Sequence, residues 1–259
     1  MSWFKVIKQR TGKEYLSYSS IKYALQDVAL FEMYMQGRLK KESDALTFGS
    51  AYDCLLFTPD RFNDTFYVFD DSDVVKQIDS KNPRATTEYK DWKETELKEV
   101  KRQSLTVLSA DDYQTAIDMI TRLDESGILN IYLQGDYQVE FLQELVVNKE
   151  VIKVRGFLDV LGDGFITDSK STRSINGFRK DVRYMDYDVQ AYLYTLAFGI
   201  RDFYWVAQEK AYPYLPAAYK ASEETLASGK NKVERAVAII KSYCESDKPA
   251  TKFYIQGEI

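Results

Sequence analysis

Two aspartates and a lysine lie close together in a segment whose pattern predicts two neighbouring β-strands. Asp159 ends one apolar stretch, and Asp168 and Lys170 end the next; the glycines of residues 162–164 are typical of the turn between them. Two carboxylates near the ends of buried strands are costly unless a cation or strong donors compensate them. Mg²⁺ takes oxygen ligands of this kind, and Lys170 adds a fixed positive charge. The combination suits phosphodiester hydrolysis, in which a metal generates hydroxide and neutralises developing charge.

The composition narrows the chemistry further. The 259 residues include no histidine, which excludes histidine-activated nucleophiles, histidine bases and the common zinc sites. The only two cysteines, Cys54 and Cys244, are far apart and suggest neither a four-thiolate cluster nor a disulfide. No Gly-x-x-x-x-Gly-Lys loop occurs, which argues against an ATP-driven helicase. Catalysis would therefore depend on carboxylates, lysine, tyrosine or a hard metal ion.

The charge pattern allows nucleic acid to bind at one local basic segment. The net charge of −5 argues against a general affinity for DNA, but residues 170–183 carry a local charge of +4. Arg173, Arg179 and Lys180 in this stretch are candidate phosphate contacts. Arg84, in a polar stretch at 74–86 that we expect to be a mobile loop, is a further one.

No apolar run approaches the roughly 20 residues of a membrane-spanning helix, and the N-terminal residues lack a hydrophobic signal core. We therefore expect a soluble, cytoplasmic protein with no membrane partner.

The segments around the charged residues predict a sheet flanked by helices. Three strand-like stretches, the first two joined by a turn at 148–149, indicate an antiparallel meander. A helix and a fourth strand follow. We therefore expect an α/β (α+β) fold with a small mixed sheet. The predicted strands span 137–147, 150–160, 164–170 and 203–207, with helices at about 186–199 and 222–244.

We expect the chain to form a single domain over residues 1–259, with a helical part at about 1–130 and the sheet with its flanking helices at about 131–259. The pattern predicts a helix that begins with Ser20 as its N-cap and ends at Gly37. The remaining elements of the N-terminal part are predicted helices at 47–57, 87–102 and 110–124 and a strand at 65–69.

Residues on the flanking helices share the spacing that would bring them to the same site. Gln190 and Tyr194 are four residues apart and lie on one helix face, although an amphipathic helix with a partly buried tyrosine explains the same pattern. Gly49 and Asp53 have the same spacing, and Gly49 would let their helix approach the sheet closely. Glu140, on the first predicted strand, is a further candidate carboxylate.

Taken together, these motifs resemble the PD-(D/E)XK nuclease superfamily, in its RecB-like branch, and most of all phage recombination exonucleases of the RecE type. The matching segments run in order over about residues 15–220. They are Tyr15-Leu-Ser-Tyr-Ser-Ser20, Gly49-x-x-x-Asp53, Gly-Phe-Leu-Asp159, Asp168-Ser-Lys170 and Gln190-x-x-x-Tyr194. The family usually has a histidine where this chain has Asp53, and a carboxylate binds Mg²⁺ or Mn²⁺ at least as well as imidazole does.

The resemblance implies a restriction-endonuclease-like core and a Mg²⁺- or Mn²⁺-dependent DNA exonuclease with one or two ions per site. Asp53, Asp159 and Asp168 would bind the metal, with the Ser169 carbonyl as an extra ligand. Lys170 would position the attacking water or help to deprotonate it, Gln190 and Tyr194 would orient the phosphate or the water, and Glu140 would add a metal or water contact.

The resemblance also implies the biological setting. Linear double-stranded DNA would be degraded 5′ to 3′ in phage-type recombination or replication, by a phage-encoded protein in the infected cell. A single-strand annealing protein would be the partner, and a ring-shaped homo-oligomer would be the assembly. The alternatives are an endonuclease or single-strand-specific nuclease on the same core, or a catalytically silent nuclease-like protein that only binds DNA.

Overall fold

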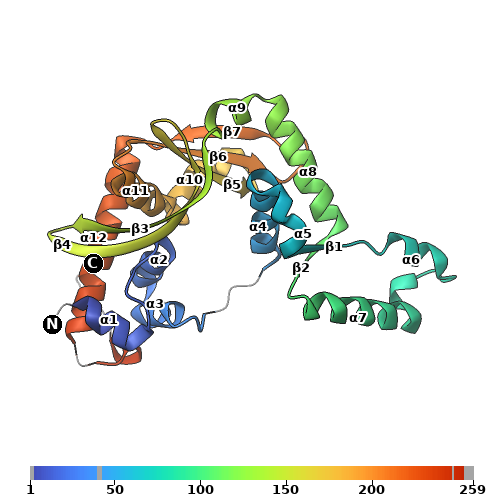
Figure 1. The fold of residues 1–259 in the computed structure, drawn as a ribbon, viewed down its shortest axis with the longest axis horizontal. Helices are drawn as coiled ribbons and strands as arrows, with labels where there is room; N and C mark the ends of the chain where they lie inside the picture. Colours follow the sequence, from blue (N-terminus) through green and yellow to red (C-terminus); the bar gives the residue numbers. More distant parts are fainter. Residues whose placement is uncertain (1–2, 40–42, 247, 254–259) are drawn as a thin grey trace.

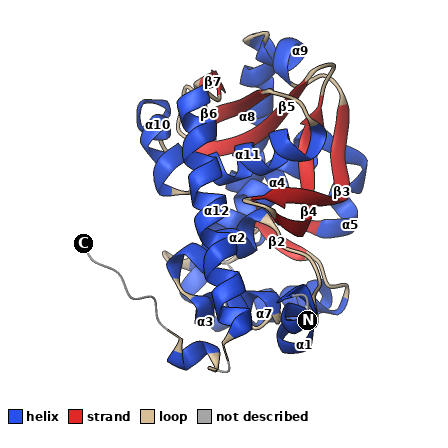
Figure 2. Ribbon diagram, turned by 90° about the vertical axis from the view of Figure 1, so that its left-hand side faces the viewer, coloured by secondary structure: helices blue, strands red, loops and turns tan. Residues whose placement is uncertain are grey.

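The computed structural model describes residues 3–39, 43–246 and 248–253. Its centre is a mixed five-stranded sheet in the order β3-β4-β5-β6-β7, in which β5 and β6 are parallel and the other neighbouring pairs are antiparallel. Helices cover the sheet, as the views in Figures 1 and 2 show. The strands are β3 (Asp136–Val147), β4 (Glu150–Leu161), β5 (Phe165–Thr172), β6 (Asp202–Glu209) and β7 (Pro216–Lys220).

The predicted meander is present, but its last two strands separate early. β3 and β4 pair along nearly their whole length and turn at Asn148 and Lys149, both of which have positive φ. β4 pairs with β5 only at Val160 and Leu161, next to the turn that joins these two strands. Before Val160 on β4 and after Thr167 on β5 the two strands no longer pair. We call the point where this pairing ends the β4–β5 fork.

The part of β4 that precedes the fork has no β5 partner, and the N-terminal part of the chain covers this edge instead. Leu16, which is fully buried, forms a parallel bridge with Val154. Its N–H donates to the Lys153 carbonyl at 2.7 Å, and its carbonyl accepts from the Arg155 N–H at 2.8 Å. A residue more than 130 positions upstream therefore supplies the hydrogen bonds that β5 does not make there.

Different helices pack on different parts of the sheet. The main apolar core joins strand residues such as Leu158, Ile166 and Phe203 to α1–α3, α11 and α12, and a smaller core joins Val160 and Val206 to α4, α8 and α9. The helices are α1 (Trp3–Thr11), α2 (Tyr18–Gln26), α3 (Val28–Met35), α4 (Asp44–Phe57), α5 (Phe62–Thr65), α6 (Ser72–Gln77), α7 (Thr87–Arg102), α8 (Ala110–Glu125), α9 (Ile128–Tyr132), α10 (Ile175–Tyr184), α11 (Tyr187–Phe198) and α12 (Glu223–Glu245).

An arm projects from this body at the right of Figure 1. It consists of α6 and α7 and is connected through a two-stranded parallel sheet of β1 (Phe66–Phe69) and β2 (Thr106–Ser109). The stretch at 74–86 that we expected to be irregular thus contributes part of α6, and a 3₁₀ turn at Pro83–Ala85 follows.

The helix that we expected to begin at Ser20 is organised differently. Ser17 is the N-cap of α2, and Ser20 is the third residue of a capping box, so the assignment of Ser20 as the cap was wrong. Asp27 ends α2 and accepts a hydrogen bond from the Ala29 N–H at 2.6 Å, which begins α3. α1, α5, α6, α9, α10, β2 and β7 were not predicted, and the one helix expected from Ser20 to Gly37 is the two helices α2 and α3. Across the described ranges, no helix is long and apolar enough to span a membrane.

Candidate active site

Asp159 and Asp168 lie on either side of the β4–β5 fork. Where the ladder between the strands ends, the backbone N–H of Ser169 has no backbone carbonyl of β4 as its partner, and it donates instead to the side-chain oxygen Oδ2 of Asp159 at 2.8 Å. The carboxylate thus replaces a strand carbonyl, which fixes Asp159 against the Asp168–Lys170 segment. This local arrangement follows from two motifs that are adjacent in sequence and joined by a tight turn.

Asp168 is 3% exposed and has a partner for each carboxylate oxygen. Oδ1 accepts a hydrogen bond from Gln190 Nε2 at 2.6 Å, and Oδ2 forms an ion pair with the ammonium of Lys170. Lys170 also donates to the Ser169 carbonyl at 3.2 Å, and its Nζ lies 5.3 Å from the centre of the Tyr187 ring. The motif residues therefore form one network that hydrogen bonds and the Asp168–Lys170 ion pair hold together.

Asp53 approaches this network from α4. The neighbouring Tyr52 fixes the helix to the sheet, because its hydroxyl donates to Gln208 Oε1 on β6 at 2.7 Å in a buried position. The close approach expected from Gly49 is not present: a Cβ there would have Ser171 Oγ as its nearest neighbour, at 4.0 Å. α4 is therefore positioned by the Tyr52 hydrogen bond rather than by a missing side chain at Gly49.

Burial and the neighbouring carboxylates raise the proton affinity of Asp159 and of Asp53. Burial raises the pKa of Asp159 to about 7, Asp168 raises it too, and Lys170 and the Ser169 N–H oppose the shift. The pKa of Asp53 is raised well above its usual value by burial and then by Asp159. Burial alone would lower the pKa of Lys170, but Asp168 and Asp159 outweigh it and raise that pKa. The site thus holds more negative charge than one lysine compensates.

Gln190 and Tyr194 share a face of α11, as expected, and both are buried. The amide of Gln190 holds Asp168, while its Oε1 is buried without a hydrogen-bond partner in the described part of the chain. The Tyr194 ring packs edge-on against Phe141 of β3 with centroids 5.4 Å apart. Burial, followed by Asp168, raises the pKa of Tyr194, which keeps its hydroxyl protonated.

The donor set suits a hard divalent cation. Three carboxylates of which two have raised pKa values, together with the Ser169 carbonyl, are the all-oxygen ligands that Mg²⁺ and Mn²⁺ prefer. Among the residues that the structure describes, however, no three acidic or cysteine side chains are arranged closely enough to hold a metal ion. Each oxygen of Asp168 already has one partner, so a divalent ion there would share Oδ1 with Gln190 or Oδ2 with Lys170.

Glu140 and the predicted DNA-contacting arginines and lysine are not part of this network. Glu140 forms an ion pair with Arg155, whose Nε donates to it at 2.6 Å. Arg84 lies on the α6–α7 arm, where its guanidinium makes two 2.7 Å hydrogen bonds to Asp71. The exposed Arg173 follows β5, and Arg179 and Lys180 lie on α10, where they line a separate pocket of about 740 Å³.

The structure adds three residues that the sequence did not assign to the site. Gln138 has a positive φ on β3, and its amide lies 3.4 Å from Asp159 Oδ1. Tyr187 lies under Lys170, and the spacing Tyr187-x-x-Gln190 on one helix face was the available signal. Tyr18 belongs to the opening Tyr15–Ser20 segment; its hydroxyl donates to the Met185 carbonyl at 2.8 Å, and desolvation raises its pKa while Lys170 partly offsets the shift.

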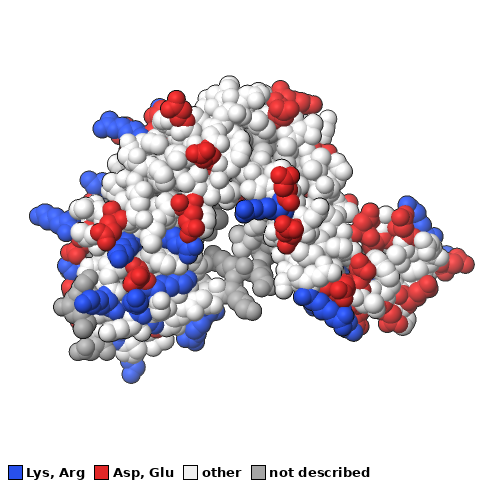
Figure 3. Space-filling view, in the orientation of Figure 1, with Lys and Arg blue, Asp and Glu red and all other residues white. Residues whose placement is uncertain are grey.

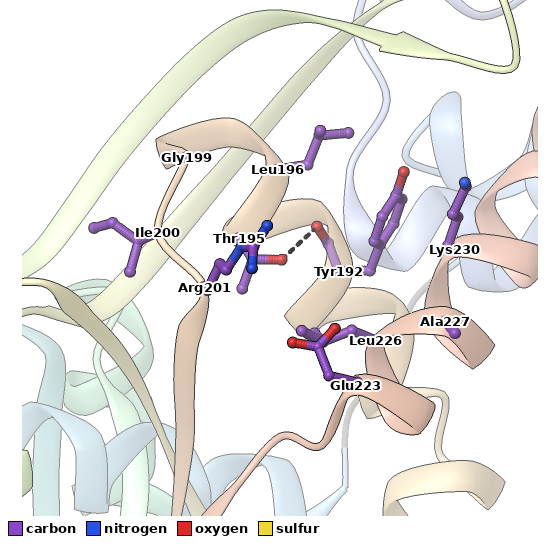
Figure 4. A pocket seen from close by; sticks show the side chains of 10 residues that line it. All are labelled: Tyr192, Thr195, Leu196, Gly199, Ile200, Arg201, Glu223, Leu226, Ala227 and Lys230. Atoms are coloured by element: carbon purple, nitrogen blue, oxygen red, sulfur yellow. Dashed lines mark hydrogen bonds between the residues drawn. The ribbon is translucent and has the colours of Figure 1, made fainter.

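A further pocket of about 430 Å³ lies between α11 and α12 (Figure 4). Arg201, Glu223 and Lys230 contribute its charged groups, and none of the three aspartates or Lys170 lines it. On the face shown in Figure 3 the molecule is hollowed between α2–α3 and α4, and both acidic and basic side chains lie at the edge of the hollow.

The mixed sheet and the carboxylate–lysine motif at its fork define a PD-(D/E)XK-type protein. The chain belongs to the family of the PDDEXK-like domain of unknown function (DUF3799), whose model matches residues 17–251. The resemblance to the PD-(D/E)XK superfamily inferred from the motifs, and the fold class that it implied, are therefore confirmed.

The chain is similar to two solved structures to different degrees. The crystal structure of a candidate exonuclease from Eubacterium rectale is 18% identical with a TM-score of 0.61, over 100% of this chain and 94% of that one. LHK-Exo in complex with dAMP is 10% identical with a TM-score of 0.37, over 93% and 94% of the two chains. No curated protein shows significant similarity to the chain. The first likeness shows the fold alone.

Proposed function

We propose that this protein is a divalent-metal-dependent deoxyribonuclease, and more narrowly an exonuclease that hydrolyses linear double-stranded DNA. The observation that carries the proposal is the network at the β4–β5 fork, in which Ser169 joins Asp159 to the Asp168–Lys170 ion pair. Membership of a PDDEXK-like family supports it.

Each residue has a role that follows from its contacts. Asp53, Asp159 and Asp168, with the Ser169 carbonyl, would hold one or two Mg²⁺ or Mn²⁺ ions. A bound ion supplies hydroxide at neutral pH and neutralises charge on the phosphate. Gln190 keeps Asp168 in place through its 2.6 Å hydrogen bond. Lys170, an ammonium held by Asp168, donates hydrogen bonds to the water or to the phosphate oxygens.

The finer parts of the proposal come from the resemblance to RecE-type exonucleases. They are 5′ to 3′ polarity, a single-strand annealing protein as partner, a homo-oligomeric ring and a role in phage-type recombination. Arg179 and Lys180 support a DNA path along α10, because they line one pocket together with Arg183 and Lys220. Arg173 would extend the same path, whereas a phosphate at Arg84 would have to displace Asp71.

A cleavage assay tests the proposal. End-labelled linear duplex, single strand and covalently closed circle are incubated with Mg²⁺, Mn²⁺ or chelator; we expect metal-dependent loss of the linear duplex and an intact circle. Asp168→Asn and Lys170→Gln should abolish cleavage, and Asp163→Asn, in the exposed turn of the same hairpin, should not. Cleavage of the circle would favour an endonuclease, and no cleavage of any substrate would exclude the enzyme.

One observation favours a second function, binding without catalysis. Gln190 and Lys170 already engage both oxygens of Asp168, and the described residues contain no ready-made metal cage. A silent DNA-binding protein would keep Lys170 on Asp168 permanently. Calorimetric titration with Mn²⁺ separates the two functions: a nuclease should bind at least one ion, with binding lost in Asp168→Asn, and a silent protein should show no saturable binding.

A further inference from the structure

A second pocket, of about 320 Å³, opens on the side of β4 that β5 leaves uncovered at the fork. Its walls come from the Tyr15–Ser19 segment, α3, β4 and α11. Five of its lining residues are aromatic and two are cationic. They include Lys13, Tyr15, Tyr34, Arg155, Phe157 and Tyr194.

This pocket adjoins the carboxylate network through two elements. Phe157 lies two residues before Asp159 on β4, so the two side chains point to the same side of the strand. Tyr194 lies one helical turn after Gln190, the residue that holds Asp168. A group that occupies the pocket is therefore next to the place where the scissile phosphate would lie.

The aromatic rings and the cations are interleaved. The Arg155 guanidinium lies 5.4 Å from the centre of the Tyr15 ring and 5.6 Å from that of Phe157, and Lys13 Nζ lies 5.8 Å from that of Tyr34. Ring faces stack on nucleobases, and nearby cations attract the phosphates that connect them. The volume is at the lower end of the roughly 300–1,000 Å³ typical of small-ligand pockets, which fits a nucleotide and not a duplex.

Two features indicate that the pocket is built for a flat partner. Phe157 is 47% exposed on a strand beside the site, although a large aromatic side chain is normally buried. Gly156 must lack a side chain, because a Cβ there would lie 2.6 Å from the Phe141 ring and 3.0 Å from the Tyr194 ring. The glycine thus allows Tyr194 to reach the pocket from α11.

We infer that this pocket binds an unpaired nucleobase of the substrate strand, with Phe157 as the stacking platform and Lys13 beside its phosphates, while Arg155 keeps its ion pair with Glu140 at the edge of the pocket. The inference rests on the proposed function, because it places the base next to the bond to be cut. It also predicts that duplex ends which fray easily are bound better than blunt, GC-rich ends.

The test uses an oligonucleotide of eight thymidines with 2-aminopurine at its 5′ end, in chelator so that nothing is cut. Stacking on an aromatic ring quenches 2-aminopurine, so the wild-type protein should quench its fluorescence. Phe157→Ala should remove the quenching and weaken binding by about fivefold or more, as expected for one lost stacking contact. Phe157→Trp should restore both, and Lys13→Gln should lower the salt dependence of binding by about one phosphate contact.

Tyr212→Ala is the matched control, since Tyr212 is an exposed aromatic residue that does not line the pocket. It should bind and quench as the wild type does. The inference is overturned if Phe157→Ala quenches and binds like the wild type, or if the wild type cleaves DNA but never quenches the probe. A protein that cuts nothing but quenches only with Phe157 present would refute the proposed nuclease and retain the pocket.

Discussion

The carboxylate of Asp188 in α11 is fully buried, and the ammonium of Lys232 in α12 lies 2.9 Å from its Oδ1. Ser228 donates to the other oxygen at 2.7 Å, and the N–H of Val189 donates to Oδ1 at 3.0 Å. Two residues after Asp188 on the same helix, Gln190 holds Asp168. The ion pair between the helices thus fixes the helix that positions a carboxylate of the candidate active site.

Removal of Lys232 should destabilise the protein strongly. Lys232→Met leaves a buried carboxylate without its counter-ion, and we expect the free energy of unfolding to fall by about 3 kcal/mol. Urea denaturation measures the change. Arg183→Gln, which breaks an exposed pair with Glu224, should cost less than about 1 kcal/mol. Equal effects of the two substitutions would contradict the structural role of Lys232.

Two glycines within helices should respond oppositely to substitution by alanine. A Cβ at Gly229 of α12 would lie 2.0 Å from the Asp188 carbonyl oxygen, so Gly229→Ala must push α12 away from α11 and should lower the melting temperature. At Gly177 of α10 the nearest atom would be 4.0 Å away, and Gly177→Ala should stabilise the protein by about 0.5–1 kcal/mol, as is usual within helices. Calorimetry compares the melting temperatures of the two variants. A Gly229→Ala protein as stable as the wild type would refute the close approach of α12 to α11.

The effect of a divalent ion on stability should grow with pH. Asp159 has a pKa of about 7 in the folded chain against 3.8 ordinarily, so between these values the folded state holds a proton that the unfolded state has lost. Without metal, this contribution to stability is complete below pH 4 and is lost as the pH rises through 7. Because metal binding needs the charged form, Mg²⁺ should raise the melting temperature more at pH 8 than at pH 5.5.

Thermal melts with Mg²⁺ or chelator at both pH values measure this difference. In Asp159→Asn the melting temperature measured in chelator should depend less on pH, since the titrating group is absent. A metal-induced shift that is the same at both pH values would show that no proton leaves the site when the ion binds.

The two cysteines should differ in reactivity. Cys244 on α12 is buried, and burial raises the pKa of its thiol to about 12, so almost no thiolate is present at pH 8. Cys54 on α4 is only half-buried. Titration of the native protein with a disulfide reagent should therefore label at most one thiol within minutes. Cys54→Ser should abolish that labelling, and rapid labelling of this variant would mean that α12 opens readily.

The sequence was informative where the interacting residues are near one another in the chain. The hairpin that carries Asp159, Asp168 and Lys170 has alternating strands and turn residues, so its structure could be predicted from local patterns. Gln190 and Tyr194 were placed on one helix face by their spacing alone. These assignments concern the structure, and the chemical roles of the residues remain predictions.

Long-range relationships could not be predicted. The side of β4 on which Leu16 binds depends on the early end of the β4–β5 ladder, which the alternating pattern does not reveal. Glu140 could be placed on a strand, but its pairing with Arg155 depends on the register between β3 and β4. Gln138 reaches Asp159 through a positive φ that is uncommon for glutamine, so no residue pattern pointed to it.

The bridge between Leu16 and Val154 also guards against self-association. Without the residues that precede α2, the carbonyl of Lys153 and the N–H of Arg155 would lose their partners and leave a free strand edge. Such an edge offers a template on which another copy can add a strand. The segment that lines the 320 Å³ pocket therefore also covers this stretch of strand edge, and a shortened chain that begins at α2 should aggregate more readily than the full chain.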